Sequence, residues 1–143
     1  MQEVAQMLRM IEIEKSFNIG TINEKQIFKG LNLTINDGDF ITVIGGNGAG
    51  KSTMLNLIAG VHKADGGRII LDGEDLTYKN ETQRAKYIGR VFQDPMMGTA
   101  PTMMIEENLA MAYRRTKRRT LAWGISQKER EMYKKSLAQL GLG

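Results

Sequence analysis

The sequence of 143 residues contains no cysteine. This excludes disulfide bonds and zinc sites with thiolate ligands, and a reducing, cytosolic setting is the natural expectation. No apolar run approaches the roughly 20 residues that a membrane-spanning helix needs. Charged residues interrupt the first 14 residues before an apolar core develops, which argues against a signal peptide. With 41% hydrophobic and 25% charged residues, the composition is that of a soluble, single-domain globular protein.

Positive charge is scarce until the last part of the chain. Residues 1–113 hold 11 Lys and Arg against 14 Asp and Glu, a net charge of −3, whereas residues 114–143 hold 9 against 2, a net charge of +7. The densest stretch, Arg114–Arg119, has five cations in six positions. Such a run can bind nucleic acid or anionic lipid, but no aromatic residues are interleaved for base stacking. We favour a solvated connection between two helices, and nucleic acid is not expected as a partner.

The apolar pattern predicts five strands. Residues 8–14 and 29–35 alternate apolar and polar side chains, which is typical of half-buried strands. Residues 40–44 and 88–92 are continuous apolar runs, which favour strands at a sheet centre that is covered on both faces. A short strand over residues 68–71 lies between two glycine turns.

The helices are predicted from spacing and from their end signals. Helical spacing follows Gly50, and Gly60 suits the position after the last turn of that helix. Residues 81–87 predict a short helix. Thr102 is the expected cap of a third helix, and Ser126–Glu129 forms a capping box that opens a fourth.

Between the apolar run and the first helix lies GGNGAGKST, which matches the P-loop pattern G-x-x-x-x-G-K-[ST]. Glycines let the backbone adopt positive φ and wrap around an anion, and consecutive N–H groups at a helix N-terminus bind phosphate. Lys51 adds a charge for the β- and γ-phosphates, the Ser52 hydroxyl is a ligand for Mg²⁺, and the Thr53 hydroxyl reaches a phosphate oxygen. A glycine-rich turn without a ligand is the alternative. We expect a nucleoside triphosphate to be bound by the whole loop, which comprises Gly45, Gly46, Asn47, Gly48, Ala49, Gly50, Lys51, Ser52 and Thr53.

The sequences on both sides of this loop indicate which family of nucleotide-binding proteins the chain resembles. The stretch GLNLTINDGDFITVIGGNGAGKSTMLNLIAGVHKADGGRIILDGEDL, followed by YIGRVFQDP, closely resembles the N-terminal part of the ATP-binding domains of ABC transporters. The resemblance runs from about Leu8 to the C-terminus. It implies an α/β fold: a P-loop NTPase core with an antiparallel β subdomain over residues 1–95, and the beginning of a helical subdomain over residues 96–143, truncated.

The resemblance also implies roles for individual residues. Phe17 stands where an aromatic ring stacks on adenine, the alternative being a core residue at a strand end. Gln93, in the Q-loop VFQDP, would complete the Mg²⁺ and water arrangement together with Ser52 and sense the membrane subunit; a buried polar glutamine is the alternative. The methionines that follow suit either a docking surface for that subunit or ordinary packing.

Several parts that this family needs for ATP hydrolysis are absent from the sequence. No LSGGQ-type motif occurs, and Asp72 does not fit the Walker B carboxylate because Asp72-Gly73 is a turn dipeptide without an adjacent glutamate. The single histidine, His62, comes too early for the switch position and is expected at the surface. We therefore expect ATP binding but no turnover by the chain alone. Without the Walker B strand, the P-loop strand would become an exposed edge, so the chain should be marginally stable or prone to aggregation.

The resulting expectation is the ATP- and Mg²⁺-binding part of an ABC transporter ATPase, of a bacterial importer. Its implied partners are transmembrane permease subunits and a second ATPase subunit, and its implied location is the cytoplasmic face of the plasma membrane. A soluble ABC ATPase that does not act in transport is one alternative. A short, non-catalytic ATP-binding module is another.

Overall fold

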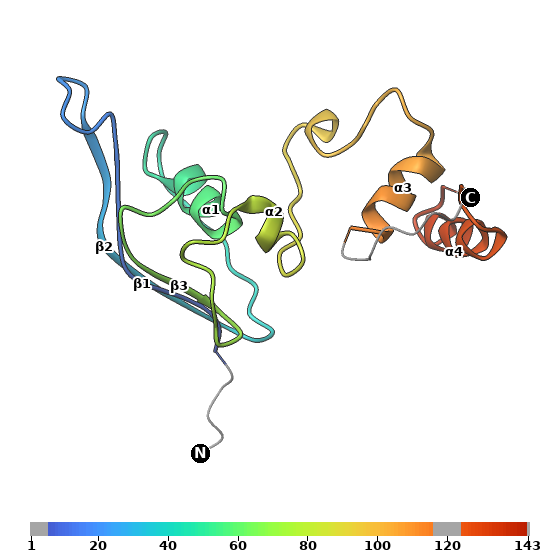
Figure 1. The fold of residues 1–143 in the computed structure, drawn as a ribbon, viewed down its shortest axis with the longest axis horizontal. Helices are drawn as coiled ribbons and strands as arrows, with labels where there is room; N and C mark the ends of the chain where they lie inside the picture. Colours follow the sequence, from blue (N-terminus) through green and yellow to red (C-terminus); the bar gives the residue numbers. More distant parts are fainter. Residues whose placement is uncertain (1–5, 116–123, 143) are drawn as a thin grey trace, which may run out of the picture. The chain divides into compact units, whose positions relative to one another are not determined.

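The computed structural model describes residues 6–115 and 124–142 (Figure 1). The chain divides into two compact units, Met1–Arg84 and Ala85–Gly143. The first unit contains the sheet and the helix that follows the phosphate loop. The second contains a short 3-10 helix and two α-helices.

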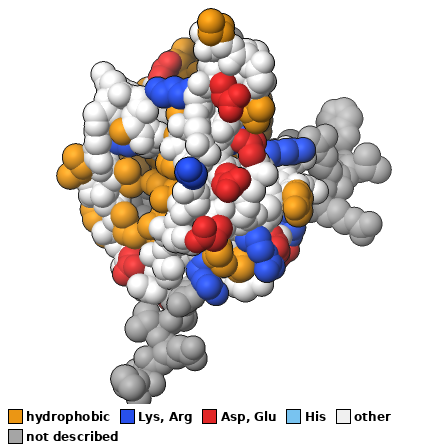
Figure 2. Space-filling view, turned by 90° about the vertical axis from the view of Figure 1, so that its left-hand side faces the viewer, with side chains coloured by type: hydrophobic (Ala, Val, Ile, Leu, Met, Phe, Trp, Pro, Cys, Tyr) orange, Lys and Arg blue, Asp and Glu red, His pale blue; other side chains and the backbone are white. Residues whose placement is uncertain are grey.

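The sheet of the first unit has four strands in the order β2-β1-β3-β4, and every neighbouring pair is antiparallel. The predicted strands over residues 8–14, 29–35 and 68–71 are confirmed, although all three are longer than expected. Figure 2 shows acidic and basic side chains interspersed on the face that it presents, without a large area of one sign. The strand bounds are β1 (Gln6–Phe17), β2 (Lys25–Asn36), β3 (Gly66–Leu71) and β4 (Glu74–Asp75).

A tight turn joins β3 to β4. Asp72 and Gly73 at its centre both have positive φ, 48° and 79°, as a two-residue type I′ hairpin requires. Asp72 is therefore a turn residue, as the sequence predicted.

Helix α1 (Lys51–Ala59) packs on the sheet and ends at Gly60, whose φ is 84° and whose N–H donates to the carbonyls of Asn56 and Leu57. This confirms the predicted helix and its glycine terminator. Helix α2 (Glu81–Arg84) is shorter than predicted. The core between the sheet and α1 is made by Leu8, Met10, Ile13, Leu57, Ile69, Leu71 and Leu76.

Two predicted strands are wrong. Residues 40–44 and 88–92 have no strand structure, and Phe40, Ile44 and Val91 are 96%, 91% and 98% exposed. A strand of a central sheet exists only when neighbouring strands accept and donate its backbone hydrogen bonds. None of the four described strands pairs with either run, so both remain irregular and most of their apolar side chains are exposed.

The second unit contains η1 (Pro95–Met97), α3 (Ile105–Tyr113) and α4 (Gln127–Ala138). Thr102 does not cap α3. That helix begins after Met104, whose N–H donates to the Glu107 carboxylate at 2.8 Å. The Asn108 side chain accepts from the N–H of Ala100 and donates to its carbonyl, and these bonds hold the preceding residues in a loop. Most of the predicted basic connection, residues 116–119, lies outside the described residues.

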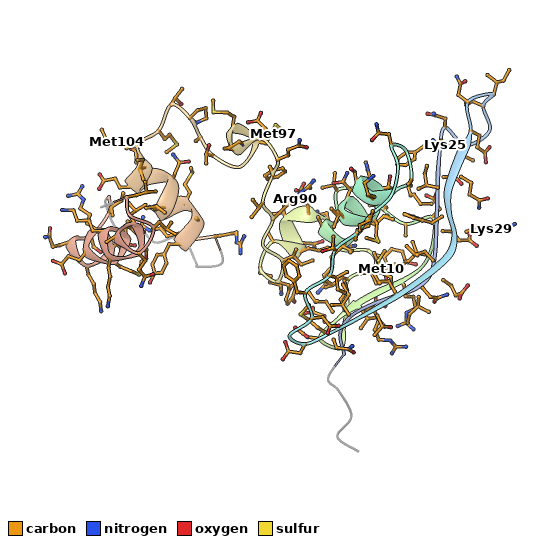
Figure 3. All side chains as sticks on the ribbon, turned by 180° about the vertical axis from the view of Figure 1, so that it is seen from behind. Met10, Lys25, Lys29, Arg90, Met97 and Met104 are labelled. Carbon is orange, nitrogen blue, oxygen red and sulfur yellow. The ribbon has the colours of Figure 1, made fainter. Side chains whose placement is uncertain are left out.

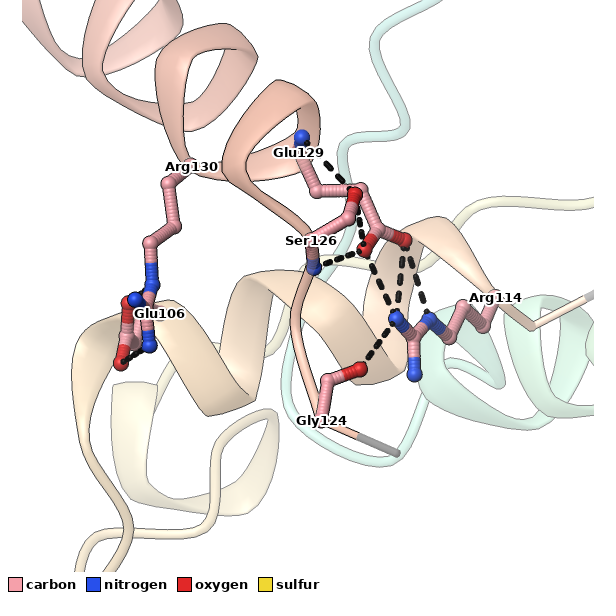
Figure 4. A network of polar contacts seen from close by, with 6 residues as sticks. All are labelled: Glu106, Arg114, Gly124, Ser126, Glu129 and Arg130. Carbon is pink, nitrogen blue, oxygen red and sulfur yellow. Dashed lines mark hydrogen bonds and ion pairs between the residues drawn. The ribbon is translucent and has the colours of Figure 1, made fainter. Parts of the chain in front are cut away.

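Ion pairs join α3 to the start of α4 (Figure 4). Arg114 donates to the Glu129 carboxylate at 2.8 Å, and Arg130 donates to Glu106 at 2.9 Å. Glu129 also completes the predicted capping box, because it accepts from the N–H of Ser126 at 2.8 Å. The Arg114 hydrogen bond, followed by those from Ser126, lowers the pKa of Glu129 to about 2. Neither these helices nor the others in the described ranges are long and apolar enough to cross a membrane.

Candidate functional site

The phosphate loop enters α1 in a conformation that only glycine adopts easily. Gly48 and Gly50 have φ of 80° and 88°, and Gly50 is the residue before the helix. The first helical hydrogen bond runs from the N–H of Met54 to the carbonyl of Gly50 at 2.8 Å. Within the part of the chain that the structure describes, the N–H groups of Lys51–Thr53 have no acceptor. These donors and the positive end of the helix dipole favour an anion at this position.

The Lys51 side chain folds back onto the backbone of the loop. Its ammonium donates to the carbonyls of Gly45 at 2.6 Å and Gly46 at 2.8 Å. A side chain at Gly46 would meet no atom within 4 Å, so this side of the loop is open. The loop thus combines free N–H donors, one ammonium and space beside them, which is the donor set that a polyphosphate requires.

The loop is packed against β2 at Gly50. A Cβ atom at this position would lie 2.8 Å from Ile27 Cγ2 and 3.0 Å from Phe28 Cζ. Contacts this short do not occur in folded proteins, so glycine is required here both for φ and for space. The packing sets the distance between β2 and the phosphate loop.

Phe17 lies at the end of β1 and is half-buried. Its ring packs edge-to-face against His62, with centroids 5.3 Å apart and an interplanar angle of 77°. The Lys15 ammonium lies 5.3 Å from the Phe17 centroid and pairs with Asp65 at 2.8 Å. The sequence analysis expected His62 at the surface; in the structure it is half-buried beside Phe17. The sequence pattern did not reveal this contact, since the two residues follow different elements.

Gln93 is exposed and lies two residues before η1. The next residue, Asp94, caps that 3-10 helix by accepting from the N–H of Met96 at 2.9 Å. Gln93 belongs to the second unit and Ser52 to the first, so the Mg²⁺ ligand pair of Ser52 and Gln93 stays a prediction. Ser52 itself is exposed in the first turn of α1, which fits a single hydroxyl ligand. Among the described residues, no three or more His, Cys, Asp or Glu side chains are grouped to hold a metal ion.

A lysine outside the loop motif also lies at the site. Lys25 begins β2, and its Nζ is 3.5 Å from the position that a Cβ at Gly48 would occupy. No sequence motif singled it out.

The family model for ABC transporters matches residues 28–143. The chain belongs to the ABC transporter family. It is 42% identical over 111 residues to a tyrosine transport ATP-binding protein of Clostridioides difficile, which covers 78% of this chain and 44% of that protein. It is 40% identical over 111 residues to a spermidine/putrescine import ATP-binding protein of Pasteurella multocida, again over 78% of this chain but 28% of the relative.

Solved ABC structures share the fold. A nucleotide-free ATP-binding cassette from an ABC transporter has a TM-score of 0.72 and 31% identity to this chain. The matched region is 96% of this chain and 55% of the cassette chain. A dimeric cassette in a post-hydrolysis state, bound to ADP and Pi, has a TM-score of 0.74 and 25% identity, over 92% of this chain and 56% of its own. The predicted P-loop ATPase fold of the ABC type is confirmed. The chain spans less than half the length of the two curated relatives.

Proposed function

We propose that this chain binds ATP with Mg²⁺ at the phosphate loop and forms part of an ATPase that drives transport across a membrane, in a bacterial importer. The observation that carries the proposal is the loop geometry, in which the N–H groups of Lys51–Thr53 and the Lys51 ammonium converge beside an open backbone at Gly46. The names of the two relatives, a transport and an import protein, favour transport over a soluble ATPase of another role.

Each residue of the site has a binding or orienting task in this proposal. Lys51 exchanges its carbonyl acceptors for β- and γ-phosphate oxygens, where its full charge strengthens the hydrogen bonds. Ser52, with Gln93, holds Mg²⁺, which when bound neutralises charge on the phosphates. Phe17 stacks on the adenine ring.

The partners proposed for the complete protein are transmembrane permease subunits and a second ATPase subunit, which would hold it at the cytoplasmic face of the plasma membrane. Hydrolysis needs a carboxylate and a signature motif that are not found in this sequence. We therefore propose ATP binding, and not turnover, for the chain alone.

The test compares MgATP affinity of the chain, of Lys51→Ala and of Lys63→Ala by titration calorimetry. Lys63 is an exposed lysine shortly after α1, so its variant loses the same charge in the same unit. Loss of a hydrogen bond from a charged donor predicts a fall of about 10- to 100-fold for Lys51→Ala. The control should stay within about twofold, the range of a surface substitution. Equal affinity of Lys51→Ala and the unchanged chain would refute the proposal.

A further inference from the structure

We propose that Lys25 is a second cation of the phosphate site, which binds the polyphosphate of the nucleotide together with Lys51. This inference rests on the proposed ATP binding and assigns a further binding residue, contributed by the sheet and not by the loop motif.

The first argument is the register of the β1–β2 hairpin. Lys25 and Phe17 are direct partners across the two strands. Side chains of directly opposed residues in an antiparallel pair share one face of the sheet. The end of the hairpin therefore presents the Phe17 ring and the Lys25 ammonium on the same face of the sheet.

The second argument is the approach of Lys25 to the loop. Its Nζ lies 3.5 Å from the Cβ position at Gly48, and glycine has no side chain that would separate the ammonium from the loop backbone. Figure 3 shows Lys25 at the end of β2 that faces the phosphate loop. This placement is held firmly, because β2 packs against Gly50 through Ile27 and Phe28. An anion in the loop would lie well within the screening length of about 8–10 Å at physiological salt.

The third argument is charge balance. Lys15, on the neighbouring strand, is neutralised by Asp65 at 2.8 Å. Over residues 6–115 and 124–142, Lys25 has no carboxylate within ion-pair distance. An unpaired ammonium beside an anion-binding loop raises the local affinity for negative charge.

The same strand supplies a matched control. Lys29 is also exposed on β2 and lies opposite Glu14 in the strand register, but Figure 3 shows it directed away from the phosphate loop. Removing either lysine changes the net charge equally. Only Lys25 should contribute to phosphate binding by contact.

The experiment measures the affinities of the full chain for MgATP and for inorganic tripolyphosphate, which has no base or ribose. The variants are Lys25→Gln, Lys25→Arg and Lys29→Gln, with far-UV circular dichroism to verify folding. Lys25→Gln should weaken both ligands about fivefold, the effect of one exposed ion pair. Lys25→Arg should retain the affinity because it keeps the charge, and Lys29→Gln should stay within about twofold. The weakening by Lys25→Gln should also diminish at high salt.

The outcomes separate this inference from the proposed function. Equal affinities of Lys25→Gln and Lys29→Gln, while Lys51→Ala loses binding, would overturn the inference and leave ATP binding intact. A loss for MgATP without a loss for tripolyphosphate would also overturn it, because Lys25 would then act on the base or ribose. A chain whose Lys51→Ala variant binds as well as the original would overturn both.

Discussion

Arg84 is the side chain whose removal should destabilise the first unit most. It is 1% exposed, and its guanidinium donates to four backbone carbonyls. Two of them, Leu57 at 2.6 Å and Ile58 at 2.9 Å, belong to α1 near its C-terminal end. The other two, Lys79 at 2.8 Å and Thr77 at 3.2 Å, precede α2. Arg84 thus joins the helix behind the phosphate loop to the segment that leads toward the second unit.

The magnitude follows from opposing terms. Hydrogen bonds from a charged donor contribute about 1.5–3 kcal/mol each, whereas burying the guanidinium costs several kcal/mol. The cost is visible in the pKa of Arg84, which burial lowers from its ordinary value. A buried carbonyl left without a donor costs about 1–3 kcal/mol, and the bonds to Leu57 and Thr77 are both buried, so we expect a loss of about 2–6 kcal/mol. A unit of this size has a free energy of unfolding of about 4–13 kcal/mol, so Arg84→Met should remove a large part of its stability.

The assay is urea unfolding of the full chain at low protein concentration, followed by far-UV circular dichroism. The control is Arg68→Met, which removes an arginine that is 63% exposed and pairs with Asp75 at the surface. That variant should lose no more than about 1 kcal/mol. Arg84→Lys should be intermediate, because a single ammonium cannot donate to four carbonyls. A loss of less than about 1 kcal/mol for Arg84→Met, or a loss equal to that of Arg68→Met, would refute the reasoning.

Three further predictions concern the loop, the second unit and the adenine side of the site. Gly50→Ala should lose about 2–4 kcal/mol in urea unfolding and most of its ATP affinity, from positive φ and the clash with Ile27. The folded-state pKa of Glu129 is about 2, below its ordinary value of 4.5. The ionised carboxylate therefore stabilises the folded chain fully above about pH 4.5, and this stabilisation is lost as the pH falls toward 2. Melting temperatures of Glu129→Gln should change less than those of the original chain over this window. His62→Ala should weaken the affinity for MgATP about two- to fivefold and leave the affinity for tripolyphosphate unchanged. Without the edge-to-face contact to His62, the Phe17 ring is no longer held in place to stack on adenine.

Features that depend on a few adjacent residues were predictable from the sequence. The start of α1 directly after Gly50, the glycine that ends α1 and the Ser126–Glu129 capping box all follow from local chemistry, and the structure has them as expected. The prediction that Thr102 caps α3 was wrong. The side chain of Asn108, six residues after Thr102, forms hydrogen bonds with the Ala100 backbone and keeps the start of the segment in a loop.

Contacts between distant elements could not be predicted in this way. Nothing in the local pattern places His62 against Phe17, Lys25 beside Gly48, or the Arg84 guanidinium on the end of α1. Each contact depends on strand register and on the packing of α1 over the sheet. The sequence indicated that an arginine and a lysine were present, but a surface location was the default for both.

The two wrong strands differ from the phosphate loop in the contacts that each conformation needs. The apolar run over residues 40–44 indicates that these side chains are suited to burial inside a sheet that is covered on both faces. A strand forms there only when neighbouring strands pair with its backbone on both sides. The phosphate loop needs no such neighbours. Gly50 packs on Ile27 and Phe28, Lys51 donates to two loop carbonyls, and Met54 starts the helix within the same short segment. The conformation of the loop is therefore held by its own contacts and by β2 and does not require a strand at residues 40–44, which is why phosphate affinity is the property to measure first.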